Sequence, residues 1–213
     1  MSDTPNSEEP VELREALQQI SDIRQQMARS EVFRGYRSLT VGISGVLGLL
    51  AAVFQSQWVP SPATDLGRYL VLWVGVALVG ATIAGVELFV RAKNAGPGLA
   101  RDMTRLAVEQ FLPCLVVGAL LTICIYRSAP SVAWMLPGLW SLVFGLGIFA
   151  SCRLLPSPVV WAGLYYIVCG CCALRWGQGE QALAPWLMAI AFGGGQLLCA
   201  TILYWTLERK HVS

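Results

Sequence analysis

Charged side chains are scarce in this sequence. Only 13% of its 213 residues are Asp, Glu, Lys or Arg, whereas an ordinary soluble domain has about 25%. Hydrophobic residues make up 55% of the chain, and its mean hydropathy is +0.58. A water-soluble fold is therefore not expected, and we expect the lipid bilayer to surround most of the chain.

Charge of one sign does not accumulate either. The 15 Lys and Arg residues nearly balance the 13 Asp and Glu residues, and no long run of either sign occurs. Proteins that bind nucleic acids use clustered basic side chains to neutralise phosphates. Nucleic acid is therefore not an expected partner.

Residue types that carry out catalysis are also sparse. The single histidine is His211, close to the last residue of the sequence. The apolar stretches contain hydroxyls and amides without a neighbouring His, Lys or Asp that could activate them. A P-loop pattern and a zinc-protease helix motif are both absent from the sequence. We therefore expect neither an enzyme nor a cofactor.

Cysteine is present, but its pattern does not suggest a disulfide framework. All seven cysteines lie in or beside apolar stretches, which is typical of small core residues. On a helix, Cys169 and Cys172 would share a face while Cys171 would point elsewhere, and no histidine accompanies them. We predict that these thiols pack in the core and bind no metal.

Six apolar runs are long enough to cross a membrane. A helix of about 20 apolar residues spans the roughly 30 Å of hydrocarbon in a bilayer. The runs lie at residues 39–55, 69–90, 111–126, 132–150, 158–174 and 184–206. They predict an all-α membrane protein with six transmembrane helices over residues 39–207 and a short tail at residues 208–213.

Basic residues predict how the chain crosses the membrane. If residues 1–38 lie inside, every Lys and Arg falls on the inner side except Arg68, Arg127 and Arg175, as the enrichment of Lys and Arg in cytoplasmic loops requires. The first residues are acidic and lack the basic start of a cleaved signal peptide, so we expect them to be retained. We expect both termini to be cytoplasmic and the membrane to be a plasma (inner) membrane.

Residues 1–38 predict a cytoplasmic amphipathic helix before the bundle. Apolar residues recur there at spacings of three and four, which gives one narrow seam on a polar helix. The seam consists of Leu13, Leu17, Ile20, Ile23 and Met27. Packing on the chain's own bundle, binding to a cytoplasmic protein or to a second copy, and binding to the membrane surface all remain open. The last is the least favoured, because acidic and basic residues are mixed on the polar face.

The middle of the sixth run has an unusual composition. Gly193, Gly194, Gly195 and Gln196 follow one another near its centre, although each glycine destabilises a helix by about 1 kcal/mol relative to alanine. One interpretation is close helix packing with a glutamine that bridges helices. The other is a locally unwound helix whose carbonyls and amide face a substrate cavity, as in transporters.

Glu87 is the only acidic residue inside a predicted span. It lies near the inner end of the second run and four residues before Arg91, the favourable order for a helical ion pair. We predict this ion pair, and we keep open a second interpretation in which Glu87 lines a cytoplasmic vestibule.

Local signals predict further details of the bundle. Residues 99–110 should form a short inner helix of their own after a turn at Asn94, and the fourth span should begin near Ser131 and bend at Pro137. Small residues recur along three of the predicted spans, which is typical of tight packing between membrane helices. These rows are Gly42, Gly45 and Gly48; Ala77, Ala81 and Gly85; and Ser141 with Gly145.

Two classes of function are compatible with these patterns. The leading hypothesis is a non-catalytic multi-pass membrane protein that acts through protein contacts of its N-terminal helix. The alternative is a small-solute transporter or channel with a broken sixth helix.

Overall fold

The fold is helical throughout the part of the chain that the structure describes. This computed structural model describes residues 38–94, 99–152 and 157–208, and these ranges contain no strand. The predicted N-terminal helix, with its seam Leu13, Leu17, Ile20, Ile23 and Met27, lies outside the described residues. Most of the predicted tail lies outside them as well.

Six helical segments are long and apolar enough to cross a membrane, which confirms the predicted number. They are Ser38–Trp58, Leu66–Val90, Val108–Ser128, Pro130–Ser151, Ser157–Trp176 and Pro185–Thr206. Most extend a few residues beyond the apolar runs, because polar residues at the ends of a run continue the same helix.

The first four spans are built from four α-helices and one short 3-10 helix. In chain order these are α2 (Ser38–Trp58), α3 (Leu66–Asn94), α4 (Leu99–Ser128), the 3-10 helix η1 (Pro130–Met135) and α5 (Leu136–Ser151). Helix α3 ends at Asn94, where the sequence predicts a turn.

The last two spans contain more irregular helix. The fifth consists of the 3-10 turn η3 (Ser157–Val159) and α6 (Val160–Trp176), and η4 (Gly179–Gln181) lies in the connection that follows it. The sixth consists of α7 (Pro185–Met188), the π-helix η5 (Ala189–Gly194), α8 (Gly195–Leu203) and the π-helix η6 (Tyr204–Glu208).

The separate inner helix predicted at residues 99–110 is wrong. These residues are the first part of α4, which continues without interruption through Pro113 to Ser128. No glycine or proline between residues 99 and 112 ends the helix. A proline within a membrane helix is tolerated because neighbouring groups can satisfy the backbone that it leaves unpaired.

The fourth span changes its helical geometry next to Pro137, where the sequence predicts a bend. The fourth span does begin near Ser131, but as the 3-10 helix η1, and the α-helix begins only at Leu136. Pro137 lies in the first turn of α5, where its missing N–H leaves no helical hydrogen bond unmade. It therefore lies at the start of the α-helix, directly after the 3-10 helix.

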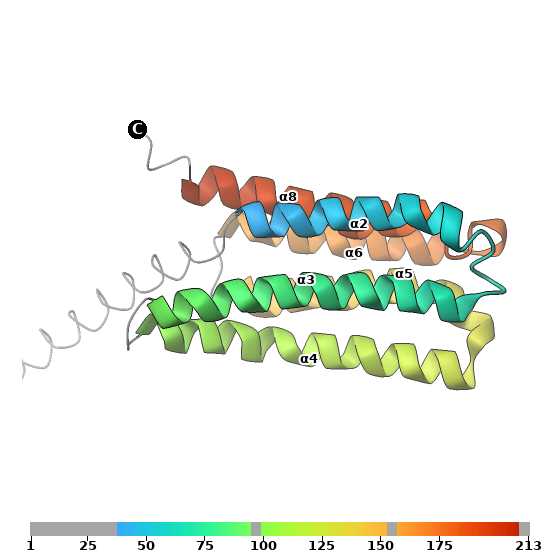
Figure 1. Cartoon of the computed structure of the whole chain (residues 1–213), viewed down its shortest axis with the longest axis horizontal. Coiled ribbons are helices and arrows are strands. Elements are labelled where there is room, and N and C mark those ends of the chain that lie inside the picture. Colours follow the sequence, from blue (N-terminus) through green and yellow to red (C-terminus); the bar gives the residue numbers. More distant parts are fainter. Residues whose placement is uncertain (1–37, 95–98, 153–156, 209–213) are drawn as a thin grey trace, which may run out of the picture.

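The helices run side by side along the long axis of the molecule (Figure 1). The start of α2 and the end of the last helix lie at the same end of the bundle, at the left of Figure 1, as an even number of spans requires. We call this the Ser38 end. The connection between α2 and α3 lies at the opposite end.

Helices α5 and α6 pack closely through glycines. A β-carbon on Gly138 would lie 2.9 Å from the Gly170 carbonyl oxygen, and one on Gly170 would lie 2.9 Å from the Gly138 oxygen. Farther along, a β-carbon on Gly145 would lie 3.1 Å from the Gly163 oxygen. The tight packing predicted for the row of Ser141 and Gly145 is confirmed, and its partner is α6.

Helices α3 and α4 pack much less closely. Ala77, Ala81 and Gly85 are exposed, and nothing lies within 4 Å of a β-carbon placed on Gly85. The tight packing predicted for this row is therefore not found inside the described bundle.

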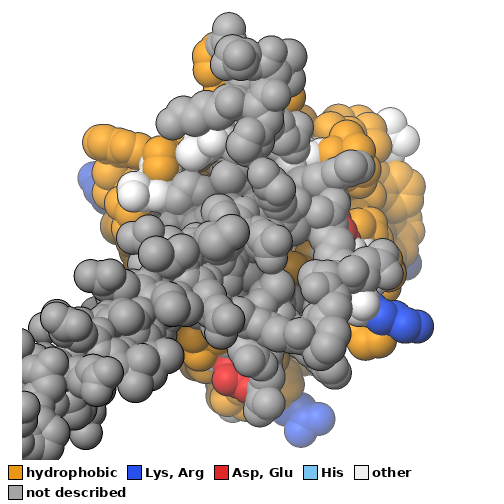
Figure 2. Space-filling model, turned by 90° about the vertical axis from the view of Figure 1, so that its left-hand side faces the viewer, with side chains coloured by type: hydrophobic (Ala, Val, Ile, Leu, Met, Phe, Trp, Pro, Cys, Tyr) orange, Lys and Arg blue, Asp and Glu red, His pale blue; other side chains and the backbone are white. Residues whose placement is uncertain are grey.

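Figure 2 views the Ser38 end and shows hydrophobic side chains around much of its described perimeter, as a bilayer-facing surface requires.

Candidate functional site in the sixth span

The glycine-rich segment of the sixth span remains helical. Gly193 and Gly194 close the π-helix η5, and Gly195 and Gln196 begin α8. The backbone is therefore widened by π-helical turns, and it is not unwound as the transporter interpretation supposed. π-Helical turns inside α-helices occur frequently at functional sites, which keeps this segment as the candidate site.

Each of the three glycines faces a different neighbour at close range. A β-carbon on Gly193 would lie 2.5 Å from Leu49 Cδ2 of α2. A β-carbon on Gly194 would lie 2.6 Å from the Tyr165 hydroxyl oxygen of α6. One on Gly195 would lie 2.5 Å from Cζ of the next tyrosine, Tyr166. A larger residue would force Leu49 of α2 or a tyrosine of α6 to shift, and Tyr166, which faces Gly195, is fully buried. Close packing is therefore a sufficient reason for the glycines.

The glycine row of α2 completes this contact from the other side. A β-carbon on Gly48 would lie 3.4 Å from the Gly193 nitrogen, and one on Gly45 would lie 3.1 Å from the Gly193 oxygen and 3.1 Å from Gln196 Cβ. The tight packing predicted for the α2 row is therefore confirmed. Gln196 is partly buried at this helix contact.

A hydrogen bond from α6 holds the π-helical segment. The Tyr165 hydroxyl donates to the Ile190 carbonyl oxygen at 2.8 Å. Local π-helical geometry in membrane helices disturbs the regular backbone hydrogen bonds, and side chains of neighbouring helices satisfy the groups that it frees. Tyr165 is thus positioned both to bond η5 and to limit the size of residue 194.

Aromatic rings fill the centre of the bundle beside this segment. The ring centroid of Phe144 lies 4.8 Å from that of Tyr166 and 5.6 Å from that of Phe192, and the rings of Tyr166 and Phe192 are also 5.6 Å apart. Tyr166 is 0% exposed. These rings join α5, α6 and η5 in one inner core cluster, and they occupy the space beside the glycines with apolar atoms.

A second polar centre, which the sequence did not predict, lies toward the end of the bundle opposite the Ser38 end. Gln55 of α2 is 0% exposed. Its Nε2 donates to the Leu183 carbonyl oxygen at 2.8 Å, and its Oε1 accepts a hydrogen bond from Trp73 Nε1 at 2.8 Å. Leu183 lies in the connection before α7 and has a positive φ of 59°. One amide therefore ties together α2, α3 and a connection that is distant in sequence.

A signal for Gln55 exists in the sequence. Gln55 continues the buried stripe of α2 that contains Gly45, Gly48 and Ala52, at helical spacings of three and four. The prediction placed Gln55 at the last position of the first span, where an amide is ordinary. Because α2 extends three residues farther to Trp58, the amide lies inside the core.

Another hydrogen bond within the bundle joins α4 and α5. Trp140 Nε1 donates to Thr122 Oγ1 at 2.9 Å, and Thr122 Oγ1 donates to the Gly118 carbonyl oxygen at 2.7 Å. The ring of Tyr69 stacks on Trp140 with centroids 6.4 Å apart. The Tyr69 hydroxyl is buried and has no hydrogen-bond partner among the described residues.

Glu87 lies in α3, apart from the sixth span. Its side chain is partly buried, and the side chain of Arg91 lies outside the described part of the structure. The predicted ion pair therefore stays a prediction. An exposed pair does join Arg68 to Asp65 at 3.2 Å, one turn apart at the start of α3.

The remaining candidate residues are the three neighbouring cysteines of the fifth span. Cys171 is exposed, whereas Cys169 and Cys172 are half-buried. In residues 38–94, 99–152 and 157–208, no group of three His, Cys, Asp or Glu side chains could hold a metal ion.

Comparison of the chain with protein-family models, curated proteins and solved structures gives no match.

Proposed function

We propose that this protein is a non-catalytic, multi-pass integral membrane protein that acts through protein–protein contacts of its cytoplasmic N-terminal helix. In this proposal the bundle is a rigid anchor in a plasma (inner) membrane, and both termini are cytoplasmic. The observation that carries the proposal is the contrast between a closely filled bundle and a polar N-terminal segment with an apolar seam.

The filled interior supports the anchor role. Glycines, alanines and aromatic rings occupy the contacts among α2, α5, α6 and the sixth span, and the buried amide of Gln55 is used in hydrogen bonds within the chain. Such contacts stabilise one arrangement of the helices. The polar and apolar groups at these contacts therefore stabilise the bundle itself.

The N-terminal segment supplies the group that can act outside the bundle. Its seam of Leu13, Leu17, Ile20, Ile23 and Met27 is narrow, which is the pattern that helix-in-groove recognition and paired helices use. The partner is then a cytoplasmic protein with an apolar groove or a second copy of this chain.

Orientation is proposed from charge. The start of the first span and the end of the last span lie at the same end of the bundle (Figure 1). Most basic residues of the sequence belong to the segments that six spans would put on that side. Of the three basic residues expected on the other side, Arg68 is paired locally with Asp65.

The alternative function, a small-solute transporter or channel, keeps one supporting observation. The sixth span contains π-helical turns next to a partly buried glutamine. The close contacts of Gly193, Gly194 and Gly195 favour packing over a substrate cavity.

The proposal is tested by matched variants of the seam in the full chain. Ile20→Asp places a charge on the seam, whereas Gln18→Asp places the same charge on the polar face. After amine cross-linking in intact membranes, we expect Ile20→Asp to lose the cross-linked complexes that the original chain and Gln18→Asp form. Equal complexes in all three chains, at equal membrane insertion, would contradict the proposal.

A further inference from the structure

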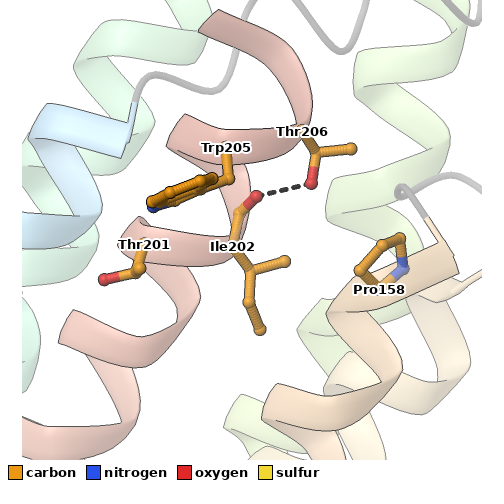
Figure 3. A pocket seen from close by; sticks show the side chains of 5 residues that line it. All are labelled: Pro158, Thr201, Ile202, Trp205 and Thr206. Carbon is orange, nitrogen blue, oxygen red and sulfur yellow. Dashed lines mark hydrogen bonds between the residues drawn. The ribbon is translucent and has the colours of Figure 1, made fainter. Parts of the chain in front are cut away.

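An apolar groove lies at the Ser38 end of the bundle, on the last turns of the sixth span. Its volume is about 400 Å³, and it is lined by Pro158, Thr201, Ile202, Trp205 and Thr206. Figure 3 shows Pro158 of η3 on one side and the two threonines, Ile202 and Trp205 on the neighbouring helix. The groove thus lies between the start of the fifth span and the end of the sixth.

The chemistry of the groove is apolar although two of its residues carry hydroxyls. Thr201 Oγ1 donates to the Leu197 carbonyl oxygen at 2.8 Å, and Thr206 Oγ1 donates to the Ile202 carbonyl oxygen at 2.5 Å. Both hydroxyls therefore bond to their own helix, as the dashed line in Figure 3 shows for Thr206. None of the five lining residues is charged, so the groove suits aliphatic side chains.

The depth of the groove matches that of a helix lying on the membrane surface. The sixth span ends at Thr206, and Thr201 lies about 8 Å farther into the membrane at 1.5 Å per residue. An amphipathic helix at a membrane interface buries its apolar face by about 5–10 Å. A helix at the Ser38 end would therefore bring its seam to the level of the groove.

The predicted N-terminal helix is joined to the bundle close to the groove, at the start of α2. Helix α2 begins at Ser38, and its first turns pack on the end of the sixth span: Val41 and Leu203 are buried in one core cluster. A β-carbon on Gly42 would lie 3.7 Å from Ala200 Cβ. The start of α2 is therefore close to Thr201 and Trp205, and Figure 3 shows the pale blue ribbon of α2 on the side to which the Trp205 ring points.

The length of chain before α2 is sufficient for return to the groove. Residues 28–37 separate the seam from α2, and ten residues span up to about 33–36 Å when extended. A helix of the same ten residues spans about 15 Å. A segment tethered so closely has an effective concentration in the millimolar range.

We propose that the groove binds the N-terminal helix of the same chain, with the seam residues Leu17, Ile20 and Ile23 against Trp205 and Ile202. This inference rests on the proposed function, because it assigns to the seam a second, intramolecular site. A seam that occupies the groove is not available to a protein partner. The groove therefore competes with the partner and sets how readily the protein associates.

Photo-cross-linking in the full chain tests this docking. A benzoylphenylalanine probe replaces Trp205 in one variant and Thr201 in a second, so that the result does not depend on the loss of one indole. Phe89 is the matched control site, because it is also the second-last residue of its span and is 71% exposed, compared with 56% for Trp205. Mass spectrometry identifies the peptide that each probe captures in membranes.

We expect the probes at 205 and 201 to capture residues 13–27 of the same chain, and the probe at 89 not to capture them. Ile20→Asp should lower the yield at least about tenfold, because an unpaired carboxylate is costly in an apolar groove. Gln18→Asp should change it by no more than about twofold, as for an ordinary surface substitution.

Three outcomes would overturn the docking proposal. They are capture of lipid acyl chains alone, capture of residues 13–27 only from a second, differently tagged copy, and equal capture by the probe at 89. If capture fails while Ile20→Asp still abolishes the cross-linked complexes, the docking is refuted and the proposed function stands. If capture succeeds while Ile20→Asp leaves the complexes unchanged, the proposed function is refuted and the docking stands.

Discussion

The buried amide of Gln55 provides the sharpest test of how this bundle is held together. Gln55→Leu keeps a side chain of similar size but removes both hydrogen bonds of the amide. The indole N–H of Trp73 and the carbonyl oxygen of Leu183 are then left in the core without these partners. No neighbouring helix has to move for this loss to occur.

The expected magnitude follows from these two bonds. Hydrogen bonds between membrane helices contribute about 0.6 kcal/mol on average and about 1.7 kcal/mol at most. A buried polar group that loses its partner costs about 1–3 kcal/mol in soluble proteins. We therefore expect Gln55→Leu to lower the free energy of unfolding by about 1–3 kcal/mol.

The assay is reversible unfolding in lipid bicelles, with Gln57→Leu as the matched control. Gln57 lies two residues farther along the same helix and is exposed. A double-mutant cycle with Trp73→Phe then isolates the Gln55–Trp73 bond, and we expect a coupling energy of about 0.6–1.7 kcal/mol. Equal stability of Gln55→Leu and Gln57→Leu, together with no coupling to Trp73→Phe, would refute the reasoning.

Three further predictions concern the sixth span and two tyrosines, the partly buried Tyr165 and the buried Tyr69. Gly195→Ala should lower the free energy of unfolding by about 1–3 kcal/mol through overpacking, whereas Gly85→Ala, with nothing within 4 Å of its β-carbon, should not; unfolding in bicelles compares the two. Tyr165→Phe loses its bond to the π-helix and should cost about 0.5–1.5 kcal/mol, while Tyr69→Phe removes a hydroxyl without a described partner and should be neutral or stabilising in the same assay. Vesicles reconstituted with the original chain or with Gln196→Leu should show equal solute flux at the level of empty vesicles; flux that falls on substitution would favour the transporter.

The number of membrane-crossing helices was predictable from the sequence because hydrocarbon imposes a length on apolar runs. The first predicted run begins at Leu39, one residue after the start of the first helical span. The last predicted run ends at Thr206, where the last helical span also ends. The glycine row of α2 was predictable for a related reason. Small residues at helical spacing allow backbones to approach, and Gly45 and Gly48 indeed face Gly193.

Features that depend on the partner of a residue were not predictable. The row of Ala77, Ala81 and Gly85 recurs every four residues and the row of α2 every three, and both are helical spacings. The α3 row is nevertheless exposed, because spacing does not specify a facing helix. The role of Gln55 depends on Leu183, which is 128 positions away in the chain. Pro137 could start or bend a helix, and only the 3-10 helix before it decides between them.

The contacts of α2 give a physical reason why a displacement at the N-terminal helix would be transmitted to the last helix. Helix α2 meets the sixth span at three levels: Val41 with Leu203 in one cluster, Gly48 against Gly193, and Gln55 bonded to Leu183 just before α7. Close-packed contacts transmit a displacement because they leave no space to absorb it. A displacement of Ser38 would therefore be transmitted along the sixth span, including the groove residues at its end. Helix α3 also contacts α2, through the hydrogen bond from Trp73 to Gln55 and at Gly80, where a β-carbon would lie 3.2 Å from Ser44 Oγ. Gly85, farther along α3, lies in open space.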